Sequence, residues 1–132
     1  MDANLLNISK IETYLNSIID NVVSKNTFFG DIPEKATLDP SWEDMVFIEF
    51  PNGINDKNAY GEGVALVWLY VKPLASGRKN VKRMSEMEHS LNEVIASSSH
   101  PNYVLARLST YTDFDTSIDW HCNAVEILVK IY

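Results

Sequence analysis

The chain of 132 residues has one cysteine, Cys122, and it has no apolar run that approaches the roughly 20 residues a membrane-spanning helix needs. A single cysteine excludes a disulfide within the chain and fits a reducing compartment. The first twenty residues contain Asp2, Glu12 and Asp20 and lack both a basic start and a long apolar core, so they do not resemble a signal peptide. We therefore expect a soluble intracellular protein of one domain, because the length is too short for two ordinary ones.

Basic residues are also scarce, with 11 Lys and Arg against 18 Asp and Glu and a formal net charge of -7. This balance excludes a generally basic nucleic-acid binder as a first interpretation. Five of the eleven basic residues fall within residues 72–83, and they are Lys72, Arg78, Lys79, Lys82 and Arg83. The rest of the chain then carries 18 acidic and six basic residues. The sequence thus predicts an acidic body with one basic patch.

The five glycines do not form a phosphate-binding loop, because Gly61-Glu62-Gly63 lacks the further glycine and the following helix of a dinucleotide site. His121 and Cys122 suggest a nucleophile and its base, but neighbouring residues of a strand point to opposite faces. Asp119 could share a face with His121, yet no serine is placed beside them. A strand with packed Trp120 and Cys122 is the better interpretation.

Metal sites receive no better support from the sequence. The spacing of His89, His100 and His121 matches no zinc pattern. The aspartates at 113, 115 and 119 lack the glycine and the final glutamate of a calcium loop. We therefore predict that the protein is not an enzyme and holds neither a metal nor a cofactor.

The hydrophobic pattern predicts an α+β fold with the order α-β-β-α-β-β. Three- and four-residue spacing indicates a helix over residues 4–24, with Leu5, Ile8, Ile11, Leu15, Ile18 and Val22 as its stripe and Ile19 widening it. Residues 32–44 read as an irregular connection, and residues 52–61 as a long polar loop. The remaining expected elements are strands over 45–50, 63–71, 103–111 and 118–131 and a helix over 79–97.

These elements predict a mainly antiparallel sheet of about four strands, with both helices packed on one face and the other face free. Leu128 and Tyr132 fall on the outer side of the last strand, which indicates that the free face meets a partner or another subunit. Scattered exposed apolar residues are the alternative explanation.

The basic residues Arg78, Lys79, Lys82 and Arg83 lie where a helix begins, although the helix dipole disfavours positive charge there. Contact with a phosphate backbone or with the acidic surface of another subunit would explain them. A solvated loop is the alternative. No aromatic residue is interleaved with these charges, so stacking on nucleic-acid bases is not supported.

The order of elements resembles the small tail-terminator, or tail-completion, proteins of long-tailed bacteriophages and related prophages. The resemblance rests on the N-terminal helix, the apolar strand at residues 64–71, the single long helix over 81–95 and the closing strand at residues 119–132. It covers most of the chain and depends on pattern, since no diagnostic motif is present.

Membership of that family would imply a structural protein that forms a ring, commonly a hexamer, at the head–tail joint. The partners would be further copies of the chain and tail-tube or head-connector proteins, and DNA would only pass through the channel. The protein would act in the host cytoplasm or in the virion tail. The alternative function is that of a stand-alone binding or regulatory domain, with a small ligand or a protein on its free sheet face.

Overall fold

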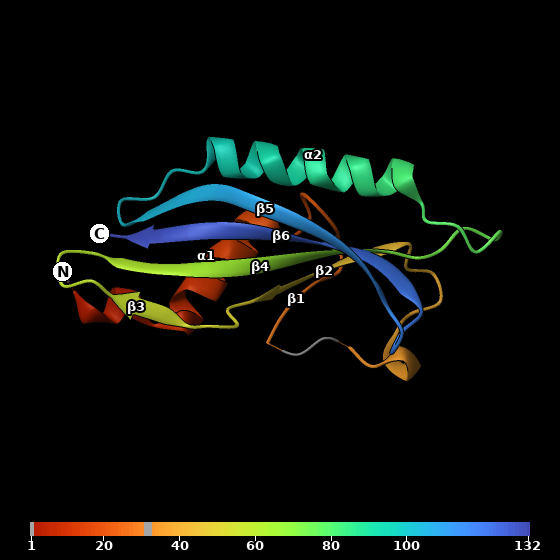
Figure 1. Ribbon diagram of the computed structural model, residues 1–132, viewed down its shortest axis with the longest axis horizontal. Helices are drawn as coiled ribbons and strands as arrows, with labels where there is room; N and C mark the ends of the chain where they lie inside the picture. Colours follow the sequence, from red (N-terminus) through yellow and green to blue (C-terminus); the bar gives the residue numbers. More distant parts are fainter. Residues whose placement is uncertain (1, 31–32) are drawn as a thin grey trace.

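The computed structural model describes residues 2–30 and 33–132, and Figure 1 shows their arrangement. Two α-helices and six strands form an α+β fold, as the sequence predicted. The elements are a short 3-10 helix η1 (Ala3–Leu6), α1 (Ile8–Ile19), β1 (Thr27–Phe29), a second 3-10 helix η2 (Lys35–Thr37), β2 (Asp44–Glu49), β3 (Ile54–Asp56), β4 (Gly61–Val71), α2 (Val81–Ser97), β5 (Tyr103–Asp115) and β6 (Trp120–Ile131).

One mostly antiparallel sheet has the strand order β1-β2-β4-β6-β5, and β3 pairs with the other end of β4. Only β1 and β2 run parallel. The long strands β4 and β6 pair over eleven residues in the middle of the sheet. A register shift interrupts the pairing of β5 with β6 between Arg107 and Thr110. β5 is an outer strand of this sheet.

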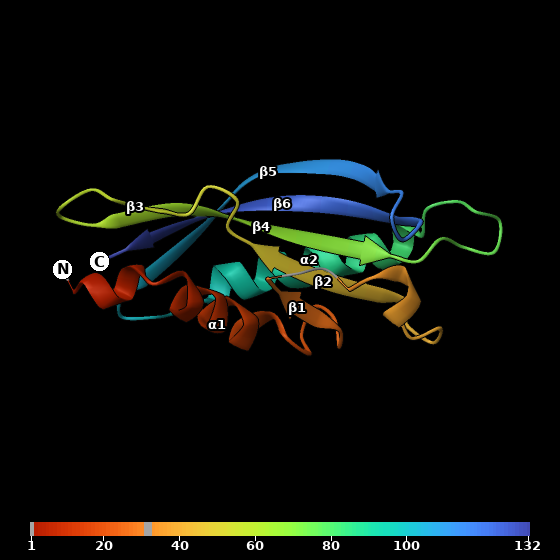
Figure 2. The same ribbon diagram turned by 90° about the horizontal axis from the view of Figure 1, so that it is seen from below.

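Both helices cover the same face of the sheet, which Figure 2 shows as a helical layer below the strands. Alternate residues of each long strand point to that face, because side chains of a strand alternate between its two sides. They pack against the buried stripes of α1 and α2. The main core consists of Ile11, Leu15 and Ile19 of α1, Met84, Met87, Leu91 and Val94 of α2, and strand residues such as Val67, Leu69, Val125 and Ile127.

A second, smaller apolar cluster lies on the opposite face of the sheet. Met45, Phe47, Tyr70, Trp120 and Cys122 belong to it, together with Ile118. Leu38 and Trp42, from the connection before β2, pack against this cluster. The opposite face is therefore covered at one end and open over the rest of its length.

The sheet has six strands, and the sequence prediction of about four was wrong in this number. The two additional strands, β1 and β3, have only three residues each. β3 lies within the predicted 52–61 loop, so that prediction was also wrong, and the hairpin turn is limited to Lys57–Tyr60. The backbone N–H of Lys57 donates to the carbonyl of Tyr60, and Asn58 has a φ of 72°.

Pro51–Gly53, a proline followed by an Asn-Gly pair typical of turns, separate β2 from β3. β2 and β3 are consequently two parts of one interrupted strand along β4. A Cβ at Gly63 of β4 would lie 2.9 Å from the carbonyl oxygen of Gly53. Only glycine therefore fits at position 63 without a shift of the neighbouring backbone.

The N-terminal helix is shorter than predicted. α1 ends at Ile19, because Asp20 leaves the helical conformation and Asn21 has a φ of 61°. The turn exposes Val22 and buries Val23, and Ile8 is 38% exposed. Residues 33–43 form the predicted connection and include η2, while residue 32 lies outside the described residues.

Candidate interaction surface

The open part of the sheet carries an apolar groove of about 360 Å³. Val64, Leu66 and Trp68 of β4 form its floor with Ala124 of β6. These four residues alternate with core residues, so they point away from the helices. Tyr111 of β5, 55% exposed, forms one wall. A concave apolar hollow with a few polar groups at its edge is a candidate binding surface.

Acidic side chains surround this groove. An adjoining hollow of about 380 Å³ shares Trp68 and Asp113 with it and adds Glu49 and Asp115. Glu49 accepts a hydrogen bond of 2.9 Å from the indole Nε1 of Trp68. With Glu126 on the groove itself, four carboxylates line the two hollows, and neither hollow is lined by Lys or Arg among the described residues.

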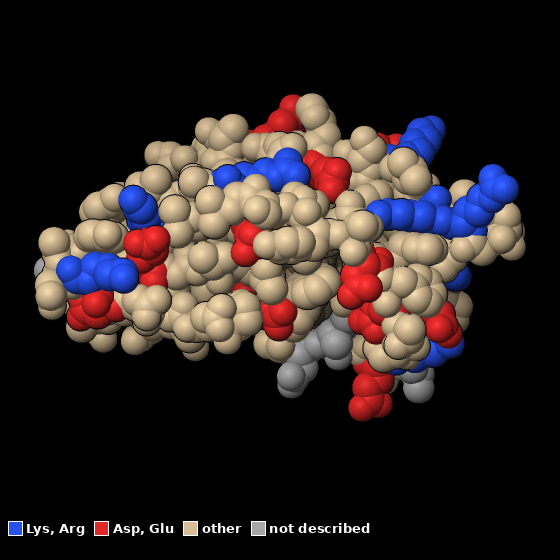
Figure 3. All heavy atoms as spheres, viewed as in Figure 1, with Lys and Arg blue, Asp and Glu red and all other residues tan. Residues whose placement is uncertain are grey.

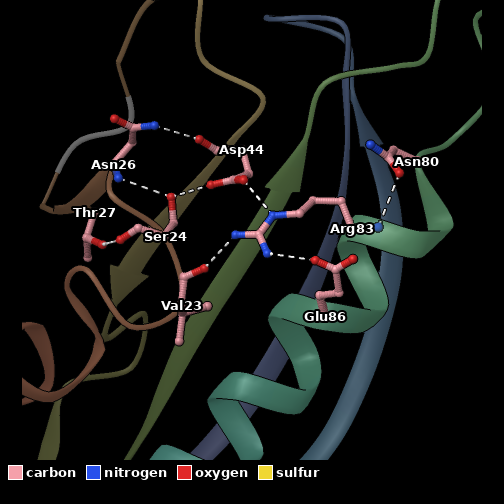
Figure 4. A network of polar contacts seen from close by, with 8 residues as sticks. All are labelled: Val23, Ser24, Asn26, Thr27, Asp44, Asn80, Arg83 and Glu86. Atoms are coloured by element: carbon pink, nitrogen blue, oxygen red, sulfur yellow. Dashed lines mark hydrogen bonds and ion pairs between the residues drawn. The ribbon is translucent and has the colours of Figure 1, made fainter.

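The four basic residues singled out in the sequence have different roles in the fold. Arg83 is fixed inside the molecule, as Figure 4 shows. Its Nε lies 2.6 Å from Oδ2 of Asp44, and its terminal nitrogens donate to the carbonyl of Val23 and to Glu86. The hydroxyl of Ser24 donates to the other oxygen of Asp44. Arg83 thus joins α2 to β2 and to the turn after α1.

Lys79 is also held within the molecule. Its Nζ donates to Oγ1 of Thr112 at 3.0 Å and to Oδ1 of Asn123 at 2.8 Å. The amide nitrogen of Asn123 donates in turn to Glu88 of α2. This chain of hydrogen bonds attaches the start of α2 to the helix-covered side of β5 and β6.

Arg78 and Lys82 are exposed, and neither forms an ion pair with another described residue. Lys82 lies in the first turn of α2, where Asn80 caps the helix by accepting a hydrogen bond from the N–H of Arg83. The cap compensates locally for the unfavourable charge at the helix start. Arg78 and Lys82 are therefore the members of the basic patch that a partner can reach.

The loop between β4 and α2 projects beyond the end of the sheet (Figure 1). A turn closed by two backbone hydrogen bonds, Leu74 N–H to the carbonyl of Arg78 and Gly77 N–H to that of Leu74, gives it a defined shape. Gly77 has a φ of 83°, which favours glycine. Leu74 is 47% exposed and Val81 66% exposed. The loop thus presents apolar and basic groups together.

The sequence placed Leu128 and Tyr132 together on the open side of the sheet. Of the two, only Leu128 extends the surface of the groove. Leu128 is opposite Val64 of β4 and Ala106 of β5 and is half-buried. Tyr132 lies after the end of β6, where its ring stacks on Tyr60 at 6.0 Å between centroids. Tyr132 is therefore placed near the β3–β4 turn and away from the groove.

No protein-family model matches the chain, and a search of the curated proteins finds no match. The interaction surface consequently has to be interpreted from its own geometry. No helix in the described part of the chain combines the length and apolar character that crossing a membrane requires.

His121 and Cys122 lie on opposite sides of the sheet, as their adjacency in a strand predicted. Cys122 is buried in the second cluster, whereas the His121 ring contacts Phe114 edge-on at 4.9 Å between centroids. Asp119 pairs with Lys35 and not with His121. His89 pairs with Glu93, and His100 stacks on Tyr103, so the three histidines are separated. The described residues contain no group of three His, Cys, Asp or Glu side chains that could hold a metal ion.

Burial raises the pKa of the Cys122 thiol to about 11, from an ordinary value of 9.0, and the nearby carboxylates of Asp113 and Asp115 add to the shift. The thiol of Cys122 therefore ionises more readily in the unfolded chain than in the folded one. The resulting stabilisation of the folded state is complete below pH 9 and is lost as the pH rises toward 11. We expect the free energy of unfolding, measured by urea titration, to fall over this range.

A Cys122→Ala variant separates the thiol from other groups in that experiment. Burial also raises the pKa of Tyr70, with Cys122 and Asp115 contributing, so both proteins keep some dependence on pH. The decrease should be smaller in Cys122→Ala. Equal decreases in the two proteins would contradict a buried thiol.

Sequence reasoning missed the residues that form the groove. Val64, Leu66 and Trp68 were recognised only as part of a nearly continuous apolar strand. The alternation of side chains along the strand could have found them. Ala65, Val67 and Leu69 point into the core, so the residues between them point to the other face of the sheet. Glu49 and Glu126 alternate with apolar residues in their strands, but their position beside one groove depends on the strand order.

Proposed function

We propose that the protein is a structural assembly protein that forms a ring of identical subunits. It resembles the tail-terminator proteins of long-tailed phages in the order of its elements. In this role the ring closes the end of a tail tube, meets the head connector and lets DNA pass through its channel. A net charge of -7 suits such a channel, because an acidic surface does not retain the phosphate backbone.

The observation that carries the proposal is the open apolar face. The two helices occupy one side of the sheet, and the groove with Val64, Leu66 and Trp68 lies uncovered on the other. Leu128 extends this apolar surface along β6. Contact with another protein molecule would remove this surface from water, at about 25 cal/mol for each Å² buried.

The test of the proposed function is the size of the unmodified protein in solution. We expect multi-angle light scattering to give a mass several times that of the 15.0 kDa chain, and the mass should rise with concentration until a ring closes. Electron microscopy of the largest species should then show closed rings. A protein that remains monomeric at the highest attainable concentration, also under chemical crosslinking, would refute self-assembly.

The groove also favours a second candidate function, a binding domain for a small ligand or a protein segment. Its volume of about 360 Å³ and its mixture of Trp68, Tyr111 and two carboxylates are typical of small-molecule sites. A strictly monomeric protein whose Trp68 fluorescence changes on addition of a cationic aromatic compound would support this function over assembly.

A further inference from the structure

We infer that the groove receives the β4–α2 loop of a second copy of this chain. This inference rests on the proposed function and names the contact by which the subunits would join. The loop is defined here as residues 72–80 together with the first two residues of α2, with Leu74 and Val81 as its exposed apolar groups and Arg78 and Lys82 as its exposed charges. The groove is the apolar hollow lined by Val64, Leu66, Trp68, Tyr111 and Ala124, with its acidic rim of Glu49, Asp113, Asp115 and Glu126.

The two surfaces are complementary in both polarity and charge. The loop combines two exposed apolar residues with two unpaired cations, and the groove combines an apolar floor with four carboxylates. Figure 3, drawn with the open face toward the viewer, shows basic side chains at the end where the loop projects and others over the rest of the face, with acidic side chains between them. Opposite charges that face each other across an interface select the correct partner and fix its register.

The loop of one molecule cannot fill the groove of the same molecule. It leaves the end of β4 at Val71 and extends beyond the sheet (Figure 1), whereas the groove is lined by Val64, Leu66 and Trp68 earlier in the same strand. Lys79, through Thr112 and Asn123, holds the base of the loop on the helix-covered side of the sheet. Arg83 and Asp44 hold the following helical turn. The occupant of the groove must therefore come from another molecule.

A contact between two different surfaces of identical chains is heterologous, and each added subunit presents the same free groove or loop again. Such contacts produce a ring when the rotation between neighbours closes. This geometry agrees with the ring of the proposed function, and it explains why the basic loop and the acidic groove occur in the same chain. The turn closed by Leu74, Gly77 and Arg78 limits the entropy that the loop loses on binding.

Charge reversal tests the contact on the full chain. The loop variant is Arg78→Glu with Lys82→Glu, and the groove variant is Asp113→Lys with Glu126→Lys. We expect each to raise the concentration of half-assembly by about a hundredfold, because like charges would then oppose one another across the contact. A matched control for the loop variant, Lys10→Glu with Lys57→Glu, changes the net charge by the same amount at two other exposed positions and should assemble like the unmodified protein.

Two further samples make the test specific for a heterologous contact. A chain that carries all four reversals should assemble again, because the exchanged charges attract. An equimolar mixture of the loop variant and the groove variant should also assemble, with the two variants alternating, since each junction then joins either an intact loop to an intact groove or a reversed loop to a reversed groove. Circular dichroism and the thermal midpoint show whether each variant is folded. If the groove variant does not fold, the loop variant, whose two changes lie on the surface, is sufficient to test the contact.

The outcomes separate this inference from the proposed function. If the unmodified protein assembles and the loop variant assembles equally well, the loop–groove contact is wrong and self-assembly stands. A folded four-reversal chain that remains monomeric would also overturn the contact. An unmodified protein that is always monomeric overturns both proposals.

Discussion

Replacing Ile127 with alanine is expected to lower the free energy of unfolding by about 3 kcal/mol, which is typical for truncation of a fully buried aliphatic side chain. Ile127 is 1% exposed and lies in the middle of β6, within the core that the two helices cover. This decrease in the free energy of unfolding has two parts, the lost free energy of burying the removed methyl and methylene groups and the cost of the cavity that they leave. Urea unfolding followed by tryptophan fluorescence, in dilute protein, measures it.

The neighbouring residue supplies the control. Leu128 follows Ile127 in the same strand but points to the open face, where it is only half-buried. We expect Leu128→Ala to cost about 1 kcal/mol or less in the dilute protein. Similar losses for the two variants would mean that the two faces of β6 are equally buried, and the open face would no longer be available as an interaction surface.

The second large effect is expected for Asp44. Its carboxylate accepts hydrogen bonds from Arg83 and from the hydroxyl of Ser24, and its side chain is 14% exposed. Asp44→Ala leaves a partly buried guanidinium without its main partner and should lower the free energy of unfolding by about 2–3 kcal/mol. A truncation of Glu43, the exposed neighbour, should change it by about 0.5 kcal/mol at most.

An Asp44→Asn variant shows whether the charge or the geometry dominates at this position. Asparagine keeps one carbonyl oxygen for Ser24 or Arg83 but removes the negative charge. We expect the free energy of unfolding of Asp44→Asn to lie between those of Asp44→Ala and the unmodified protein. If Asp44→Ala and Glu43→Ala unfold at the same urea concentration, the network in Figure 4 does not hold α2 to β2.

Much of the fold follows from local patterns in the sequence. Alternation between apolar and polar residues predicts β6, and the continuous apolar run predicts β4, which lies in the middle of the sheet. Three- and four-residue spacing identified α2 through Met84, Met87 and Leu91. These long elements contain enough periodic positions to define a face, and the faces predicted that both helices pack on one side.

The short and irregular features could not be predicted in this way. β1 has three residues and pairs in parallel with β2, and no local pattern signals such a pair. The exposure of Val22 and the burial of Val23 depend on the positive φ of Asn21, which shifts the stripe by one residue. The second apolar cluster depends on Trp42 and Leu38, whose connection lies across the sheet only in the folded chain.

The candidate site was only partly predictable for the same reason. The basic block was visible in the sequence. Which of its residues are paired within the molecule and which are exposed was not visible there. Arg83 pairs with Asp44, which is 39 residues away, and Lys79 binds Asn123, which is 44 residues away. Sequence separation of this size hides which charges are satisfied within the molecule. The exposed pair, Arg78 and Lys82, emerges only after these partners are known.

The register shift in β5 has a consequence for a protein that presents an open sheet at high local concentration. β5 is an outer strand of thirteen residues, and a continuous edge of this length would invite uncontrolled pairing with other chains. The irregularity between Arg107 and Thr110 divides the edge into two shorter parts, and irregularities of this kind increase the local twist. Amyloid-like stacking along the whole strand is thereby disfavoured. The chain can keep an apolar face accessible for a specific contact while its edge resists aggregation.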